Sequence, residues 1–522
     1  MTKPFPFHGL FSRRGLKILL WTAFVCFSIF FLLRQIADWR GARALSRAED
    51  TLRKEQEWLS PSTFFRGPVP DELNFFASPS LVDLATPQGE TQRKRLVELL
   101  TFGEPHGHPP FPKSQGQIGH PTDFEKWLLF LNPDEPVPAG EREQAERYFA
   151  EAEAHDRALV QELISAASRK QAVIKQGVFT VEVENRIEER PAEPANHPDG
   201  RKWWDIQMPH VEVLRKMSHG LGLQASAAAR TGRPGEAMGR LHVLFRLREG
   251  MREPALIVFL NRLQFTEASI RNVIWEGLQS RSFDPSQLEQ IQEWLMDSDL
   301  ADDYLQVLRL ERIVLHQLIG GFKSEPNFHR SFVGGGQDSG GLVDTGVRAG
   351  IGILPMGWVA QNQARLSEAM LQCQILPAKT GDFVTMLHGQ KDLEERLVRW
   401  QQKRWREPHT FLLPFVLPAF GITERVVHAE AGTRMGTVAC ALERFYLREN
   451  RYPEALTELV PRFLEDIPSD PCSNLAFGYQ PAGERYRLWS TGLDGQDDQG
   501  SPAESRGLLS LQSTGDWLWS YE

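Results

Sequence analysis

An apolar run near the N-terminus constrains the fold more than any other feature of this 522-residue chain. The run, Ile18–Leu33, contains sixteen uncharged residues, slightly fewer than the roughly 17–25 residues that cross a hydrocarbon core. Gly15 and Leu16 extend it, and the long side chain of Lys17 can reach the lipid headgroups. We therefore predict a transmembrane anchor at residues 15–34.

Two other interpretations of this run are weaker. A helix that packs one face on a globular core carries an amphipathic pattern, and no such pattern interrupts Ile18–Leu33. A cleaved signal peptide needs a small-x-small site close behind the apolar run. Ala42-Arg43-Ala44 has that form, but it lies nine residues beyond the run and among arginines. We therefore favour an uncleaved signal anchor.

Charge is distributed unevenly around the anchor. The formal net charge is −9, and residues 1–34 hold five basic and no acidic residues, so the rest of the chain carries −14. The basic tail at residues 1–14 favours the cytoplasmic side, although four arginines also follow the apolar run (Arg34, Arg40, Arg43 and Arg47). We expect the body on the opposite side. A body this acidic argues against a phosphate-binding surface and offers no basic stripe for nucleic acid.

Composition divides the remaining chain. Residues 35–60 are charged and favour a helical stalk, whereas the prolines and glycines of residues 61–140 predict a loop-rich arm. Residues 141–410 have the periodicity of a helical body. Within it, Gly232–Ala237 places a glycine stop before a proline start, which predicts a helical hairpin. The hairpin resembles a tetratricopeptide unit, but no second copy follows at a fixed spacing, so we expect irregular hairpins.

Few residues of the body have a spacing typical of a chemical site. The glycine-rich segment 333–357 lacks the order of a phosphate-binding loop, and we interpret it as a surface loop. His106, His108 and His120 have no cysteine nearby, whereas zinc needs four firmly held donors. No H-E-x-x-H, G-x-S-x-G or S-x-x-K sequence occurs. The sequence therefore predicts no catalytic residue and no organic cofactor.

The segment Arg434–Gly500 is the most informative part of the C-terminal region. A helix containing ALERFYLREN ends at a Tyr-Pro pair, and a short helix, a proline-rich loop and two strands follow. This order predicts a small α+β domain at residues 411–522. The next loop places Asp494, Asp497 and Asp498 among glycines, so that carboxylate and carbonyl oxygens can surround a calcium ion. The register of an EF-hand is absent, and a solvated turn is the alternative.

Two cysteines, Cys440 and Cys472, lie in this same region. They can pair as a disulfide if the region is oxidised. With Cys26 in the anchor, the odd number left outside it does not form a closed disulfide framework. The alternative is that these cysteines are buried thiols that pack as small apolar side chains.

Three sequences, ALERFYLRENRYP, PSDP and STGLDG, follow one another in the C-terminal fifth of the chain. In this order they resemble the globular domain of type II secretion pseudopilins. In that family the loop matching Ser490–Asp498 binds calcium and orders the C-terminal strands. The resemblance therefore implies a calcium role for Asp494, Asp497 and Asp498. The N-terminus lacks the acidic residue that follows a pseudopilin leader, which argues against processing and polymerisation.

Two further fragments, PVPDELNFFASPSL and LPMGWVAQNQARL, resemble segments of large membrane-anchored proteins of planctomycete- and verrucomicrobium-type bacteria. This resemblance implies a single-pass protein of the bacterial inner membrane with most of its chain in the periplasm. The predicted fold is mainly α, with a transmembrane helix, an irregular helical-hairpin body and a small pseudopilin-like α+β domain. The predicted function is interaction or scaffolding with protein partners in the envelope. A type II secretion component and an envelope hydrolase are the alternatives.

Overall fold

The computed structural model describes residues 13–64, 66–101, 118–131, 134, 136–137, 139–175, 208–321, 355–403, 422–502 and 515–521. His106 and His108, which were considered and not favoured as zinc ligands, and nearly all of the glycine-rich segment 333–357 lie outside these residues. The protein is mainly helical. Its contacts divide the chain into two compact units: Met1–Leu59, Arg312–Gln372 and Asp392–Pro418 form the first, and Ser60–Glu311, Cys373–Lys391 and Ala419–Glu522 form the second.

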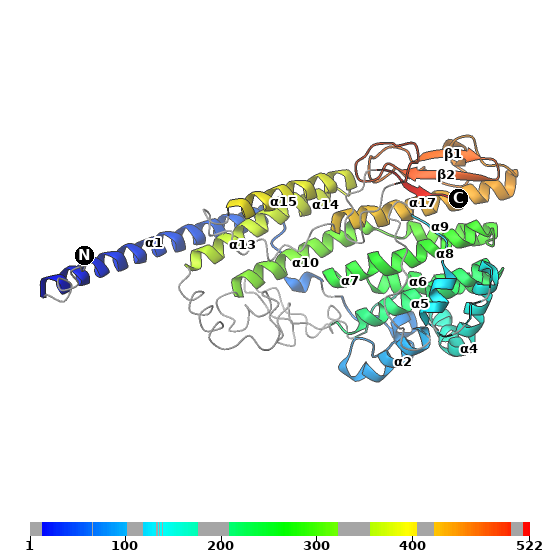
Figure 1. Cartoon of the computed structure of the whole chain (residues 1–522), viewed down its shortest axis with the longest axis horizontal. Helices are drawn as coiled ribbons and strands as arrows, with labels where there is room; N and C mark the ends of the chain where they lie inside the picture. Colours follow the sequence, from blue (N-terminus) through cyan, green and yellow to red (C-terminus); the bar gives the residue numbers. More distant parts are fainter. Residues whose placement is uncertain are drawn as a thin grey trace, which may run out of the picture. The chain divides into compact units, whose positions relative to one another are not determined.

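Helix α1 (Arg13–Lys54) is the main element of the first unit and is drawn in blue in Figure 1. The large apolar side chains from Leu16 to Leu33 are 45–68% exposed, which is the surface that a lipid environment requires. The helix is long and apolar enough to cross a membrane. It then continues without a break through the predicted stalk to Lys54.

The stalk part of α1 packs closely against α13 (Met356–Met370) within the first unit. A Cβ added to Gly41 would lie 2.2 Å from the carbonyl oxygen of Gly357, and one added to Gly357 would lie 1.9 Å from that of Ala37. The backbone N–H of Gly357 donates to Asp38 Oδ1 at 2.6 Å. Only glycines permit this approach, because any side chain would separate the two backbones.

Two further contacts join the segments of the first unit. Arg312, on α10 (Leu300–Gly321), donates from Nη2 to the carbonyl oxygen of Glu57 at 3.0 Å. One turn later His316 Nδ1 lies 3.0 Å from Ser367 Oγ on α13. The other helix that enters this unit is α15 (Phe383–Lys403). The first contact joins the end of the stalk to a helix that comes 255 residues later in the chain, and the second joins that helix to α13.

The second unit contains the helical body. Its helices are α4 (Glu141–Ala167), α5 (His210–Arg230), α6 (Pro234–Gly250), α7 (Leu256–Asn261), α8 (Glu267–Gln279) and α9 (Pro285–Met296). Helices α5 and α6 form the hairpin predicted at Gly232–Ala237, and this prediction is confirmed. Gly232 has a φ of +74° at the turn, and Pro234 opens α6, so each residue has the conformation it favours.

Parts of residues 61–140, for which we predicted a loop-rich arm, are helical and packed. Helix α2 (Glu90–Thr101) packs against α5, and α3 (Phe124–Leu131) packs against α4. Short 3₁₀ turns at Asp71–Leu73 and Phe75–Ala77 precede α2. Phe75 and Phe76 are completely buried. The prolines and glycines keep these helices short, while the apolar residues between them still join the core.

Helix α17 (Ile422–Glu449) leads into the C-terminal sheet (Figure 1). It packs against α8 and α9 and also contacts the sheet. A 3₁₀ turn at Leu456–Leu459 follows it. The sheet is antiparallel with the order β1 (Gly478–Ala482), β2 (Arg485–Ser490) and β3 (Trp517–Trp519). Strands β1 and β2 lie where two strands were predicted, whereas β3 was not predicted.

Candidate functional site

The three predicted calcium ligands lie in the turns after β2. Asp494 accepts from the backbone N–H of Gln496 and of Gly515, at 3.1 and 3.3 Å. Asp497 Oδ1 accepts from Trp489 Nε1 at 2.9 Å. Among the residues that the structure describes, no group of three or more His, Cys, Asp or Glu side chains is arranged to hold a metal ion. The carboxylates of Asp494 and Asp497 thus accept hydrogen bonds from the protein, whereas Asp498 is held through its backbone N–H, which donates to Asp516 Oδ1 at 3.3 Å.

Two buried carboxylates that the sequence analysis did not select organise this loop. Asp470 is completely buried and accepts hydrogen bonds from the backbone N–H groups of Cys472 and Thr491 and from the hydroxyls of Ser490 and Thr491, at 2.7–3.0 Å. Asp516 accepts from the N–H of Gly500 at 2.6 Å. The available signal for Asp470 was its place in a Pro-Ser-Asp-Pro turn, where aspartate commonly bonds its own backbone.

The predicted disulfide is not formed in the structure. Cys440 lies on α17, Cys472 lies in the loop before β1, and both are buried thiols. Burial raises the pKa of each of these thiols. Buried thiols with raised pKa values are poor nucleophiles and pack as small apolar groups. This is the alternative given for them above.

His120 is the one member of the predicted histidine group among the described residues. Burial lowers its pKa, and the hydrogen bond to the Pro121 carbonyl opposes this shift.

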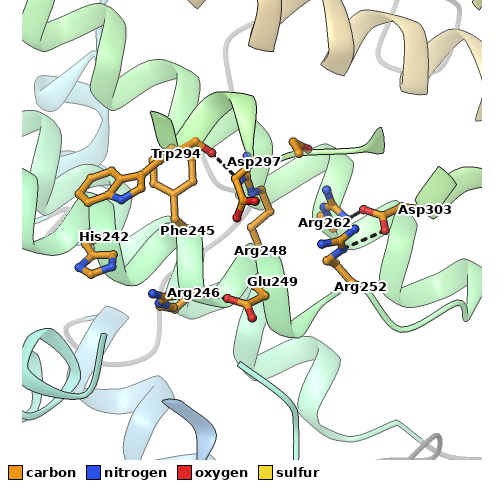
Figure 2. A pocket seen from close by; sticks show the side chains of 11 residues that line it. His242, Phe245, Arg246, Arg248, Glu249, Arg252, Arg262, Trp294, Asp297 and Asp303 are labelled. Carbon is orange, nitrogen blue, oxygen red and sulfur yellow. Dashed lines mark hydrogen bonds and ion pairs between the residues drawn. The ribbon is translucent and has the colours of Figure 1, made fainter. Parts of the chain in front are cut away.

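An arginine-lined cavity of about 90 Å³ lies in the second unit (Figure 2). It forms where α6, α9, the start of α10 and a π-helical turn, Arg262–Thr266, come together. Such π-helical turns are frequent at functional sites. The lining residues are His242, Phe245, Arg246, Arg248, Glu249, Arg252, Arg262, Trp294, Asp297, Ser298 and Asp303.

Three of the four arginines in this cavity form ion pairs. Arg262 is 1% exposed and lies 2.6 Å from Asp303 and 3.0 Å from Glu267. Burial opposes its charge, but the two carboxylates outweigh burial and raise the pKa of Arg262. Arg252 lies 2.9 Å from the other oxygen of Asp303, and Arg246 lies 2.7 Å from Glu249. The acids in these contacts are therefore already engaged.

Arg248 differs from the other three arginines. Only 6% of it is exposed, its Nη2 donates to the Trp294 carbonyl at 2.7 Å, and its guanidinium lies 4.6 Å from the centre of the Phe245 ring. Nη1 is buried without an acceptor, and no described carboxylate forms an ion pair with this side chain. Burial lowers the pKa of Arg248, but a guanidinium stays charged at any physiological pH. Glu267 and Asp297 act on this charge from beyond ion-pair distance and oppose the effect of burial on its pKa.

Two aromatic rings form another wall of the cavity. His242 stacks on Trp294, with ring centres 4.7 Å apart and planes 12° apart. Burial, followed by the nearby Arg246, lowers the pKa of His242 to about 4. His242 is therefore neutral near pH 7. The wall offers a flat apolar surface beside the charged one.

The sequence analysis missed this cavity because the chain as a whole is acidic. A local signal was present, since Leu241, Leu244 and Arg248 share one face of α6 by helical spacing. An arginine on the apolar face of a helix needs a buried partner. Its position on that face therefore indicates a buried polar cluster better than the overall charge of the chain does.

Comparison with known proteins does not extend this description. No protein-family profile, no curated protein and no solved structure matches the chain.

Proposed function

We propose that this protein is a single-pass protein of the bacterial inner membrane whose body lies in the periplasm and binds other proteins. The observation that carries the proposal is α1, in which exposed apolar side chains from Leu16 to Leu33 lead without a break into a packed stalk. A continuous helix of this kind suits a membrane span that leads directly into the packed stalk of the first unit.

The proposal includes a pseudopilin-like C-terminal domain. Its support is the order of a long helix, a short turn, two antiparallel strands and an Asp/Gly loop. A calcium role for Asp494, Asp497 and Asp498 stays a prediction. Calorimetric titration of the full chain with calcium should release heat that Asp494→Ala removes, and a wild-type titration without heat would refute this part.

The cavity favours binding over hydrolysis. A general base acts best when its pKa lies near the working pH. The only histidine among its lining residues, His242, has a pKa of about 4 and is stacked on Trp294. Arg246, Arg252 and Arg262 are held in ion pairs, and a guanidinium stays protonated and does not act as a base. We therefore place an interaction protein ahead of an envelope hydrolase.

Reporter fusions test the topology. Alkaline phosphatase fused to the C-terminus should be active. A green fluorescent protein fused at the same place and exported by the general secretion route should not fluoresce. The double variant Phe24→Arg, Phe27→Arg should be lost from the membrane fraction, because each arginine costs about 2.5–3.5 kcal/mol at the centre of a membrane helix. A fluorescent and phosphatase-negative fusion would refute the periplasmic placement.

Cross-linking tests the interaction. The anchored protein is cross-linked in its native membrane, purified and analysed by mass spectrometry. The proposal expects the same envelope proteins in repeated experiments and their loss with the Phe24→Arg, Phe27→Arg variant. Recovery of this chain alone would contradict a role in binding other proteins.

A further inference from the structure

We propose that one exposed face of α1, just beyond the apolar run, binds the acidic headgroups of the phospholipids around the anchor. This arginine face consists of Ile36, Trp39, Arg40, Arg43 and Arg47, which helical spacing places on one side of α1 and which are all exposed. All five residues belong to the first unit. The inference rests on the membrane anchor of the proposed function, but not on the side of the membrane on which the body lies.

The opposite face of α1 is the one that packs within the protein. Gly41, Ala48 and Leu52 are buried there, and Gly41 lies against Gly357 of α13. The packing of the helix therefore explains that side and leaves the arginine face exposed. Trp39 is 61% exposed on the arginine face, and tryptophan is enriched where a membrane meets water. An exposed tryptophan so close to the apolar run indicates contact with the bilayer surface.

The chain direction of α1 turns the arginine side chains back toward the membrane span. Every Cα–Cβ bond of a helix tilts toward the N-terminus, and the span lies on the N-terminal side of these arginines. The structure shows this tilt, since the Arg43 guanidinium lies 5.5 Å from the centre of the Trp39 ring. Arg47 Nε likewise donates to the carbonyl oxygen of Arg43 at 3.2 Å. Both charges are therefore closer to the span than their own Cα atoms are.

Residues 34–47 carry a local positive charge that the acidic body conceals. They contain four arginines and one aspartate, so their net charge is +3. The aspartate, Asp38, accepts from the backbone N–H of Gly357 and lies 3.9 Å from Arg34. Within the described part of the chain, the three arginines of the arginine face form no ion pair. Residues 356–364, the first turns of α13, contain no acid. Three guanidinium groups are thus available to phosphate oxygens.

The distance from the span favours lipid as the partner. A headgroup layer adds about 5–8 Å to each side of the hydrocarbon core, and its negative potential extends about 8 Å further at physiological salt. The Cα atoms of Arg40 and Arg43 lie about 10 and 15 Å along the helix from that of Leu33, so both are in this range. Arg47, at about 21 Å, comes into range because its side chain extends one turn back. Phospholipid is always present at this level.

Native mass spectrometry of the full-length protein in a neutral detergent tests the proposal. The probes are phosphatidylglycerol, which is acidic, and phosphatidylcholine with the same acyl chains, which has no net charge. We expect phosphatidylglycerol to bind at least about tenfold more tightly, because each arginine near an acidic surface contributes about fivefold. The glutamine variant, which removes the three charges together, should lose most of this preference; it combines Arg40→Gln, Arg43→Gln and Arg47→Gln.

Two further variants separate local charge from total charge and from folding. The control removes the same charge from exposed positions on α4 and α15 and should keep the lipid preference; it combines Arg142→Gln, Arg157→Gln and Arg399→Gln. Lysine at the arginine face keeps the charge but loses the planar pair of donors. The combination of Arg40→Lys, Arg43→Lys and Arg47→Lys should therefore bind phosphatidylglycerol more tightly than the glutamine variant does.

Four results would overturn the arginine face as a lipid site. These are equal binding of the two lipids, an unchanged preference in the glutamine variant, an equal loss of preference in the control, or equal weakening by lysine and glutamine. Displacement of phosphatidylglycerol by millimolar inorganic phosphate or by polyglutamate would also overturn it, in favour of a free anion or an acidic protein.

Flotation on vesicles of phosphatidylcholine alone tests the anchor separately. The full chain should float with these neutral vesicles, because an apolar span inserts without any charge on the lipid. Protein that does not float contradicts the membrane anchor of the proposed function. Protein that floats but shows no preference for phosphatidylglycerol contradicts only the lipid site on the arginine face.

Discussion

A buried glutamate on α17, the helix that leads into the C-terminal sheet, predicts that the free energy of unfolding of this region depends on pH. Glu443 lies on α17, is 3% exposed and accepts a hydrogen bond from the Tyr452 hydroxyl at 2.8 Å. Burial raises its pKa from 4.5 to about 7, although the Tyr452 hydrogen bond and then Arg281 and Arg485 act in the opposite direction. The folded protein therefore holds this proton across a range of pH in which the unfolded chain has released it.

The sign and size of the effect follow from these two pKa values. A group that binds its proton more tightly in the folded state stabilises the fold fully below the unfolded pKa of 4.5. This contribution declines as the pH rises and is lost above the folded pKa of about 7. The difference corresponds to about 3 kcal/mol. Glu443→Gln should keep the Tyr452 hydrogen bond without the ionisation, and should be more stable than wild type at pH 8 by up to this amount.

Hydrogen exchange measured by mass spectrometry isolates this region from the rest of the chain. Peptides from α17 and β2, corrected for the intrinsic rate at each pH, should show wild-type and Glu443→Gln proteins alike at pH 4.5 and the variant better protected at pH 8. Glu449→Gln, an exposed change on the same helix, should be neutral at both pH values. Parallel pH profiles for wild type and Glu443→Gln would refute the reasoning.

Three other substitutions test packing and polar contacts. Gly41→Ala should destabilise the α1–α13 contact by about 1–3 kcal/mol, which proteolysis of the stalk measures. Gly235→Ala is the control, because its added Cβ contacts nothing within 4 Å. Equal protease resistance of the two variants would contradict the close packing of α1 on α13. Asp470→Asn should cost about 2–4 kcal/mol, seen as faster exchange in β2, and unchanged exchange would remove its organising role. Arg248→Met should stay within about 1 kcal/mol of wild type in thermal unfolding, and a larger loss would make Arg248 a structural residue.

The parts of the fold that the sequence could predict are those with strong local signals. The apolar run Ile18–Leu33 predicted a helix with exposed apolar side chains. The glycine and proline at Gly232–Ala237 predicted the α5–α6 hairpin. Glycine, proline and strand-forming residues likewise located β1 and β2. Each of these signals depends only on neighbours in the chain, so no tertiary contact is needed to interpret it.

The remaining features depend on contacts between distant residues. Strand β3 has three residues and pairs with β2 through Leu518 and Trp489, so it is too short to show an alternating pattern. Helix α2 consists mainly of helix-forming residues, but it lies among the prolines and glycines that predicted a loop-rich arm, and its packing on α5 joins it to the core. Arg248 and Asp303 line the same cavity from different helices. No spacing in the sequence predicts that these two helices lie side by side.

The arginines of the cavity differ in how the fold compensates their charge. For Arg262, two carboxylates at 2.6 and 3.0 Å offset the loss of hydration, so the side chain is explained by the fold alone. For Arg248, one carbonyl at 2.7 Å and an aromatic face at 4.6 Å do not replace water around a full charge. A methionine of similar length would pack at this position without that cost. Glu267 and Asp297 attract the Arg248 charge from beyond ion-pair distance and offset part of its loss of hydration, so this arginine is held by the charge of the whole cluster rather than by one partner.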